Sequence, residues 1–194
     1  MYVIQPDNND STDQLGGKAQ ALNALNKSGL LIPAWIVLAP QAFYASTDIA
    51  QFLAAPGDTK LAPDVQSELD MALSRLCPNN EPVAVRSSAL DEDGKQHSFA
   101  GQFDSFLFVA PQDVSGKVIA VWQSAFNERG LVYRRENGLE QPPQAPAVLI
   151  QHMVNSEMSG VAFSAAPIRN SWPRSSRSSK RPKFSTRSSR SWNW

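Results

Sequence analysis

The chain has 194 residues and a formal net charge of zero, but its charges are unevenly distributed. Residues 169–194 carry eight Lys and Arg and no Asp or Glu, so residues 1–168 hold the other 10 basic residues and all 18 acidic ones, a net charge of −8 (10 − 18). The single Cys77 excludes an intrachain disulfide, and no apolar run approaches the length of a membrane span. The first residues lack the basic and apolar regions of a signal peptide, so we expect a cytoplasmic protein with no membrane partner.

Short apolar runs alternate with helical patterns in the first half of the chain. The predicted elements are a strand at residues 1–5, a helix at 15–29, a strand at 31–40, and helices at 40–53 and 63–76. Gly29 is placed to close the first helix and Pro40 to open the second. In the third helix Val65, Leu69 and Leu73 recur on one stripe, which indicates a face packed on a core.

The second half continues the alternation and ends in a different composition. The predicted elements are strands at residues 83–85 and 106–109 around a polar loop, a helix at 111–136, and strands at 147–154 and 159–165. Because helices and strands are interleaved, the predicted fold class is α+β (mixed α/β). Residues 169–194 hold nine serines and no Ala, Val, Leu, Ile or Met, so we predict a disordered basic C-terminal tail.

The first candidate feature is Gly16-Gly17-Lys18 at a predicted helix start. Glycines let a backbone approach a ligand closely, a helix N-terminus attracts anions, and a lysine adds positive charge for a phosphate. Read alone, these residues fit an ordinary helix start with a solvated lysine better.

The second feature is Arg86-Ser87-Ser88 at the end of a predicted strand. The guanidinium group offers a planar, permanently charged fork for phosphate oxygens, and the hydroxyls can add hydrogen bonds. The alternative is that Arg86 pairs with an acidic side chain of the loop that follows. The acidic residues of that loop are Asp91, Glu92 and Asp93.

The third feature is Ser98-Phe99-Ala100-Gly101-Gln102, in the loop before the second strand. A loop that contains a glycine can close over a polyphosphate and donate backbone N–H groups to it. Read alone, the segment fits an ordinary hairpin turn better.

The residues that are missing argue against other kinds of site. The sequence has no G-x-x-x-x-G-K-[ST] phosphate loop and no G-x-G-x-x-G dinucleotide motif. One cysteine and two histidines, His97 and His152, do not favour a metal cluster.

The three features occur in one consistent order with further motifs, over roughly residues 13–167. The segments are "LGGKAQAL", "GLLIPAWIVLAPQAF", "VRSSALDED", "SFAGQFDSFL" and "VLIQHMVNSEMSGVAFS". Together they resemble the N-terminal nucleotide-binding domain of phosphoenolpyruvate synthase and pyruvate phosphate dikinase. The resemblance implies an ATP-grasp fold, in which ATP lies between two α+β halves.

The resemblance also implies a site and a reaction. The expected ATP-binding residues are Lys18 and Arg86 at the phosphates, Ser98, Ala100, Gly101 and Gln102 in the covering loop, and Gln151, Met153 and Val154, with His152 among them, beside the adenine. In the family, ATP with Mg²⁺ phosphorylates a histidine on a separate swivelling domain, and that histidine then phosphorylates pyruvate.

The resemblance stops near Pro167, where the serine- and arginine-rich tail begins. We therefore expect residues 1–168 to be the N-terminal part of the ATP-binding domain, and 169–194 to be an out-of-frame tail of a truncated or frameshifted gene product. The metal ligands are expected in the missing half, and pyruvate would bind only through absent domains. The phosphohistidine motif is also missing, so no catalytic residue is assigned and full turnover is not expected from this chain alone.

A second functional class stays open at this point. A non-enzymatic module could use the basic tail to engage nucleic acid, because Arg and Ser contact phosphates and Trp stacks on bases. We favour the ATP-binding interpretation. The sequence does not distinguish a synthase, a dikinase and an antibiotic phosphotransferase, because that choice rests on domains outside the match.

Overall fold

The computed structural model describes residues 1–5, 14–89, 104–127 and 144–158. Contacts within the chain divide it into two units, Met1–Val154 and Asn155–Trp194. Only residues 155–158 of the second unit are described, so the fold below is that of the first. No helix within these described ranges is both long enough and apolar enough to cross a membrane.

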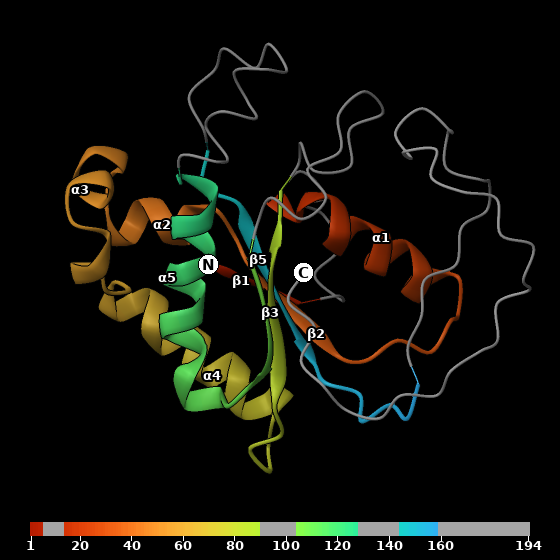
Figure 1. Cartoon of the computed structure of the whole chain (residues 1–194). Coiled ribbons are helices and arrows are strands. Elements are labelled where there is room, and N and C mark those ends of the chain that lie inside the picture. The colour runs from red at the N-terminus through yellow and green to blue at the C-terminus, as the bar shows by residue number, and fades with distance from the viewer. Residues whose placement is uncertain (6–13, 90–103, 128–143, 159–194) are drawn as a thin grey trace, which may run out of the picture. The chain divides into compact units, whose positions relative to one another are not determined.

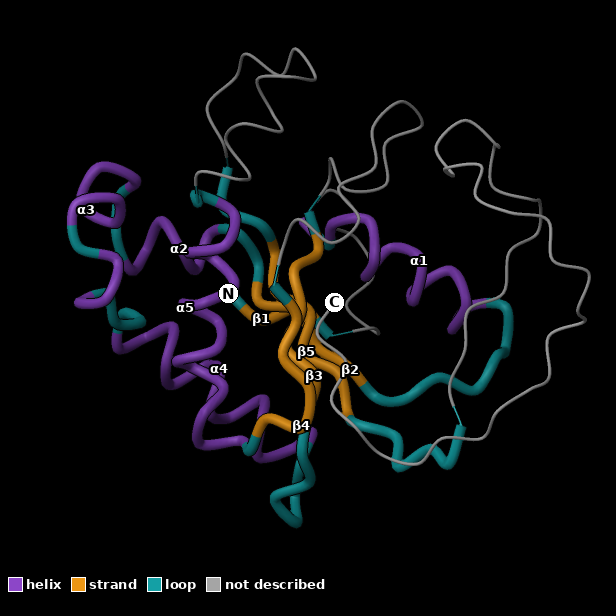
Figure 2. Tube along the Cα trace, viewed as in Figure 1, coloured by secondary structure: helices purple, strands orange, loops and turns teal. Residues whose placement is uncertain are grey.

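A five-stranded sheet forms the centre of the first unit, as Figures 1 and 2 show. Its strands are β1 (Val3–Ile4), β2 (Trp35–Leu38), β3 (Val83–Ser88), β4 (Ser105–Val109) and β5 (Ala147–His152). Their order is β1-β2-β5-β3-β4, and every neighbouring pair is antiparallel. The last strand in the sequence therefore lies in the middle of the sheet, where β5 pairs with both β2 and β3.

Helices cover both faces of this sheet. They are α1 (Gly16–Lys27), α2 (Gln41–Ser46), α3 (Ile49–Ala54), α4 (Pro63–Leu76) and α5 (Val114–Ala125), with short 3-10 turns at Pro56–Asp58 and Pro111–Asp113. Figure 1 shows α1 alone on one side of the sheet and the other four helices on the opposite side. The mixed α+β class predicted from the sequence is confirmed.

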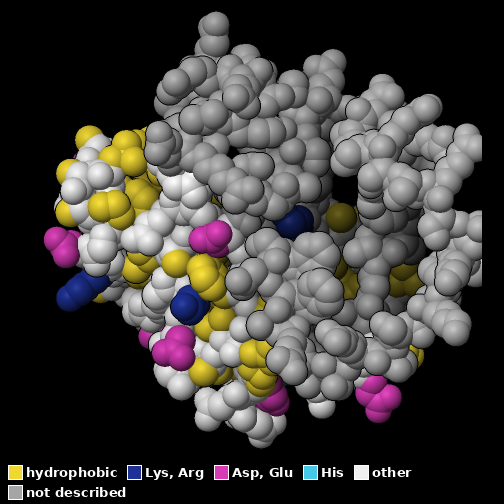
Figure 3. Space-filling model, in the orientation of Figure 1, with side chains coloured by type: hydrophobic (Ala, Val, Ile, Leu, Met, Phe, Trp, Pro, Cys, Tyr) yellow, Lys and Arg dark blue, Asp and Glu magenta, His cyan; other side chains and the backbone are white. Residues whose placement is uncertain are grey.

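We call the side with four helices the helical face. Its strands contribute Val83, Val85, Val148 and Ile150, which pack with apolar residues of all four helices in the larger of the two cores. An aromatic cluster stabilises this core, because the ring of Phe43 contacts four other rings at centroid distances between 5.0 and 5.5 Å. Those rings belong to Tyr44, Phe52, Trp122 and Phe126. The surface visible on this side mixes acidic, basic and hydrophobic side chains (Figure 3).

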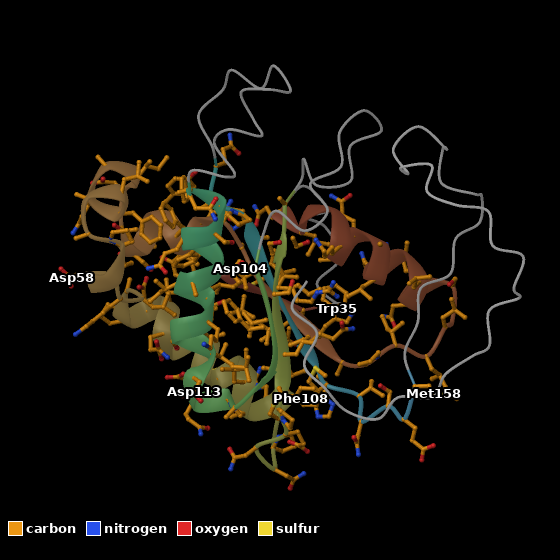
Figure 4. The ribbon with its side chains drawn as sticks, viewed as in Figure 1. Trp35, Asp58, Asp104, Phe108, Asp113 and Met158 are labelled. Atoms are coloured by element: carbon orange, nitrogen blue, oxygen red, sulfur yellow. The ribbon has the colours of Figure 1, made fainter. Side chains whose placement is uncertain are left out.

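We call the opposite side the α1 face. Its core is smaller. The start of α1 contributes Leu15 and Ala19, and β2 and β5 contribute Trp35, Val37 and Leu149, among others. Figure 4 shows Trp35 on the same side of the sheet as α1. Because side chains alternate along a strand, the residues of β3 that alternate with Val83, Val85 and Ser87 point to this face. They are Ala84, Arg86 and Ser88.

The two edges of the sheet are built differently. At β1, the Glu68 carboxylate of α4 accepts hydrogen bonds from the backbone N–H groups of Tyr2 and Val3, at 2.8–2.9 Å. At β4, the register with β3 shifts between Val83 and Val85, and Phe108 has a φ of +55°. Such a bulge bends an edge strand, and it leaves Phe108 65% exposed at the lower end of the sheet (Figure 4).

Some predicted elements differ from the structure. The single helix predicted at residues 40–53 is wrong, because Thr47 is extended and separates α2 from α3. The Asp48 side chain then caps α3 by accepting from the N–H of Gln51, at 2.7 Å. The strand predicted at 31–40 is shorter, Trp35–Leu38. The helix predicted at 111–136 begins later, at Val114, and already ends at Ala125. The predictions for residues 128–136, for the strand at 159–165 and for the tail at 169–194 lie outside the described residues.

Candidate functional site

The first turn of α1 is held by the end of β3. The residue before the helix, Leu15, makes no side-chain cap. Instead, the N–H of Gly17 donates to the carbonyl of Ala89 at 3.1 Å, and the N–H of Ala19 donates to Oγ of Ser88 at 3.1 Å. The same Ser88 hydroxyl donates to the carbonyl of Leu15 at 2.7 Å. The Gly-Gly-Lys and Arg-Ser-Ser segments, predicted separately, thus form one hydrogen-bonded unit.

Gly16 is required by this contact. Its φ is +69°, which disfavours any side chain, and a Cβ placed there would lie 1.7 Å from the carbonyl oxygen of Ser88. The missing side chain therefore lets two segments of the protein approach each other. The sequence suggested that this glycine admits a ligand to the backbone, and the structure gives it a different use.

The two segments that this contact joins each carry a cationic side chain. Lys18 is half-buried and lies between the two anchored residues Gly17 and Ala19. Arg86 is half-buried on β3, directly opposite Leu149 of β5 and Ser105 of β4. Leu149 belongs to the core under α1, so Arg86 lies on the α1 face together with the start of that helix. The arrangement can present two positive charges to one anion from neighbouring segments.

The segment predicted beside the adenine lies at the other end of the same strands. Gln151 is opposite Trp35 and Ala84, which places it on the α1 face, and its amide donates to the carbonyl of Pro33 at 3.5 Å. The N–H of Met153 donates to the carbonyl of Pro82 at 3.0 Å.

The other two members of this segment differ in their surroundings. His152 is opposite Val83 and therefore on the helical face, away from Gln151. Val154 is 54% exposed.

The spacing between the two ends of the candidate site follows from the strand register. Met153 is level with Pro82, four residues along β3 from Arg86 (86 − 82). At the rise of an extended strand, four residues span about 13 Å. That length is comparable to the distance from the base to the terminal phosphate of an extended nucleoside triphosphate.

The predicted covering loop lies outside the described residues, with Ser98, Ala100, Gly101 and Gln102. Its two attachment points are described. The chain leaves β3 after Ala89 and returns at Asp104, whose N–H donates to Oγ of Ser124 at 3.1 Å. Ser105, the next residue, is opposite Arg86. The loop therefore begins and ends near the arginine.

Sequence reasoning missed two polar groups on the α1 face. Nε1 of Trp35 and Oδ1 of Asn23 are buried without a hydrogen-bond partner. No sequence pattern marks such atoms, because their burial depends on how α1 lies on β2. Sequence reasoning also missed the role of Ser88 at the helix start. The absence of a Ser, Thr, Asp or Asn at position 15 could have indicated that another segment supplies the cap.

The described residues form no metal cage. Among them, no group of three or more His, Cys, Asp and Glu side chains comes together. The described part of the chain thus supplies cations for an anion but no cluster of acidic ligands for Mg²⁺.

Comparison with known proteins yields one matching family. The profile of the family described as "Pyruvate phosphate dikinase, AMP/ATP-binding domain" matches residues 45–180. This range contains Arg86, the loop at 98–102 and the end of β5, but it begins after Lys18.

Individual relatives carry several names. "Prodigiosin synthesizing transferase PigC" of Serratia marcescens is 36% identical over 167 residues, covering 80% of this chain and 18% of that protein. A "Probable phosphoenolpyruvate synthase" of Methanothermobacter thermautotrophicus is 37% identical over 114 residues, covering 56% of this chain and 17% of that protein. A "Rifampicin phosphotransferase" of Streptomyces sviceus is 39% identical over 106 residues, covering 54% of this chain and 12% of that protein. The chain spans less than a fifth of the length of each of these relatives.

Proposed function

The chain belongs to the pyruvate phosphate dikinase AMP/ATP-binding domain family, and from this premise we propose that Lys18 and Arg86 bind the phosphates of ATP. The observation that carries the proposal is the hydrogen-bonded unit of Gly17, Ala19, Ser88 and Ala89. It brings the lysine of one segment to the face of the sheet that carries the arginine of the other.

The chemistry of the two side chains suits a polyphosphate. The guanidinium of Arg86 can bind two phosphate oxygens at once, whereas the ammonium of Lys18 acts as a compact point charge. Both residues are half-buried, so less water competes for their charges than on an open surface.

The remaining contacts of the nucleotide are assigned by position. We propose that the loop with Ser98, Ala100, Gly101 and Gln102 covers the phosphates, because its two attachment points lie near Arg86. We propose that Gln151, Met153 and Val154 lie beside the adenine, about 13 Å away along the strands.

Magnesium would be bound mainly by the phosphates themselves. The ion neutralises phosphate charge when ATP is bound. Since the described residues hold no acidic cluster, we propose that its protein ligands lie outside them.

The reaction of the whole protein is a further proposal. By analogy with the relatives named phosphoenolpyruvate synthase, ATP would transfer a phosphoryl group to a histidine on another domain, and that phosphohistidine would transfer the group to pyruvate. The names of the other relatives leave a different acceptor open. We also propose a cytoplasmic location, which the single thiol, Cys77, supports.

Calorimetric titration with ATP and Mg²⁺ tests the assignment of Arg86. We expect micromolar or weaker binding to the wild type and a loss of about ten- to a hundredfold in Arg86→Ala, the value of one charge-assisted phosphate contact. Arg75→Ala is the matched control, because Arg75 is exposed on α4 at the helical face and should leave the affinity unchanged.

Two results would contradict the proposal. If Arg86→Ala binds ATP as tightly as the wild type does, the arginine is not a phosphate ligand. If the folded wild type binds no ATP, the described residues do not suffice for the site.

A further inference from the structure

We infer that Ser88 is a positioning residue of this site, which fixes the first turn of α1 and so sets where Lys18 lies relative to Arg86. The inference rests on the proposed binding of ATP phosphates by these two cations. Ser88 itself is buried, 1% exposed, so it offers almost no surface to a ligand.

The helix needs this serine because it has no cap of its own. A helix start leaves its first N–H groups without partners, and a Ser, Thr, Asp or Asn just before the helix usually accepts from one of them. Here that position holds the apolar Leu15, which makes no side-chain cap. Ser88 and Ala89 together replace it: the carbonyl of Ala89 accepts from the N–H of Gly17, and Oγ of Ser88 accepts from the N–H of Ala19, 69 positions away, at 3.1 Å.

The hydroxyl of Ser88 is both a hydrogen-bond acceptor and a donor. It also donates to the carbonyl of Leu15 at 2.7 Å, so one side chain binds the residue before the helix and a residue of its first turn. A third hydrogen bond joins the N–H of Gly17 to the carbonyl of Ala89, the residue after Ser88, and holds the same turn. Lys18 lies between Gly17 and Ala19, and both of its neighbours are therefore anchored.

The same strand carries the second cation. Ser88 follows Arg86 by two residues, and alternation along β3 puts both on the α1 face. A strand paired on both sides is stiff, and Arg86 is paired with Leu149 and with Ser105. Ser88 thus joins the backbone of the lysine to the backbone of the arginine through one short, buried connection.

The connection also decides which groups of the helix start face the nucleotide. The N–H groups of Gly17 and Ala19 already donate to protein acceptors. At this helix start, recognition of phosphate therefore depends on the Lys18 side chain more than on those two amides. An error in the orientation of the first turn would translate directly into a misplaced ammonium group.

A double-mutant cycle measures this role. Calorimetry would compare ATP and adenosine, which lacks phosphates, on the wild type, Ser88→Ala, Lys18→Ala and the double variant. We expect Ser88→Ala to weaken ATP binding roughly fivefold, because part of the binding free energy must then order the helix start, with adenosine binding unchanged. In the Lys18→Ala background, Ser88→Ala should have no further effect on ATP binding, because the two substitutions act on one contact.

Ser46→Ala is the matched control. Ser46 makes the same pair of bonds on the helical side of the molecule: its Oγ donates to the carbonyl of Ala42 at 2.7 Å and accepts from the N–H of Ala62 at 3.0 Å. Its replacement should cost similar stability and leave the ATP affinity unchanged. Hydrogen exchange without nucleotide adds a second readout: the Ala19 amide should exchange faster in Ser88→Ala than in the wild type.

The outcomes separate this inference from the proposed function. If the wild type binds ATP and Ser88→Ala binds it equally well, or loses ATP and adenosine to the same extent, the positioning role is wrong. If the wild type binds no ATP, the proposed function and the positioning role both fail, and the Ala19 exchange rate still shows whether Ser88 caps the helix. Unchanged Ala19 exchange in Ser88→Ala would overturn the inference in either case.

Discussion

The two faces of the sheet bury hydrophobic cores of different size. On the helical face, four helices and the strands bury one continuous core around the ring of Phe43. On the α1 face, a single helix covers a much smaller core. Both faces leave buried polar atoms without a hydrogen-bond partner, Nε1 of Trp35 and Oδ1 of Asn23 on the α1 face and Nε1 of Trp122 on the helical face. The face with the larger core supports the fold, whereas the face with the smaller core carries the candidate site. Such a division is common, because binding residues are selected for their ligand and not for stability.

Breaking the helical face should have the largest effect. Phe43 is completely buried and contacts Phe52, Trp122 and Phe126. We expect Phe43→Ala to lower the free energy of unfolding by about 3–5 kcal/mol, because it leaves a cavity that the rings around it cannot fill. Chemical denaturation followed by fluorescence measures the change.

The neighbouring aromatic residue provides the control. Tyr44 contacts the same ring but is 49% exposed. Tyr44→Ala should cost much less, about 1 kcal/mol. Equal losses in the two variants would show that the aromatic cluster does not dominate the stability of the helical face.

On the α1 face, the largest expected effect comes from Gly16. Gly16→Ala would force a side chain onto a φ of +69° and against the carbonyl of Ser88, so we expect a loss of at least about 2 kcal/mol. The same variant should bind ATP more weakly, because the contact between α1 and β3 is disturbed. Denaturation and calorimetry give the two values.

Another glycine offers a matched comparison. A Cβ at Gly116 in α5 would meet nothing within 4 Å, and its backbone is helical. Gly116→Ala should therefore raise the stability, by up to about 1 kcal/mol. A Gly16→Ala variant as stable as the wild type would mean that α1 can lie further from β3 without loss.

The smallest change in stability is expected from removing an unpaired polar group on the α1 face. The amide oxygen of Asn23 is buried without a partner, which costs roughly 1–3 kcal/mol. Asn23→Leu removes the unpaired oxygen at similar volume and should raise the free energy of unfolding by about 1 kcal/mol. Thermal unfolding measures it, with Asn26→Leu on the exposed side of the same helix as a control that should change little. A destabilised Asn23→Leu would indicate that the oxygen is solvated after all.

The comparison of the faces also shows which predictions from the sequence were accurate. The stripe of Val65, Leu69 and Leu73 predicts α4, and all three residues are buried in the structure. The predicted family is confirmed by a profile that spans most of the chain. The helix predicted at 40–53 is wrong, because the pattern of apolar residues continues across Thr47 while Asp48 starts a new helix by capping it. The assignment of individual ATP-binding residues stays a prediction.

The sequence by itself determined individual helices, which depend on residues close together in the chain, and the family, which depends on the order of the motifs. Hydrophobic periodicity within one helix predicts α4 and α5, because the residues that share a face lie three or four positions apart. The order of the Gly-Gly-Lys, Arg-Ser-Ser and Phe-Ala-Gly-Gln segments indicates the family. Only the tertiary structure decided that β5 pairs between β2 and β3, that Gly16 must lack a side chain, and that Ser88 caps α1. These features depend on contacts between residues far apart in the sequence, such as Ala19 and Ser88, 69 positions apart, and Trp35 and Gln151, 116 positions apart (151 − 35). No local pattern records such contacts.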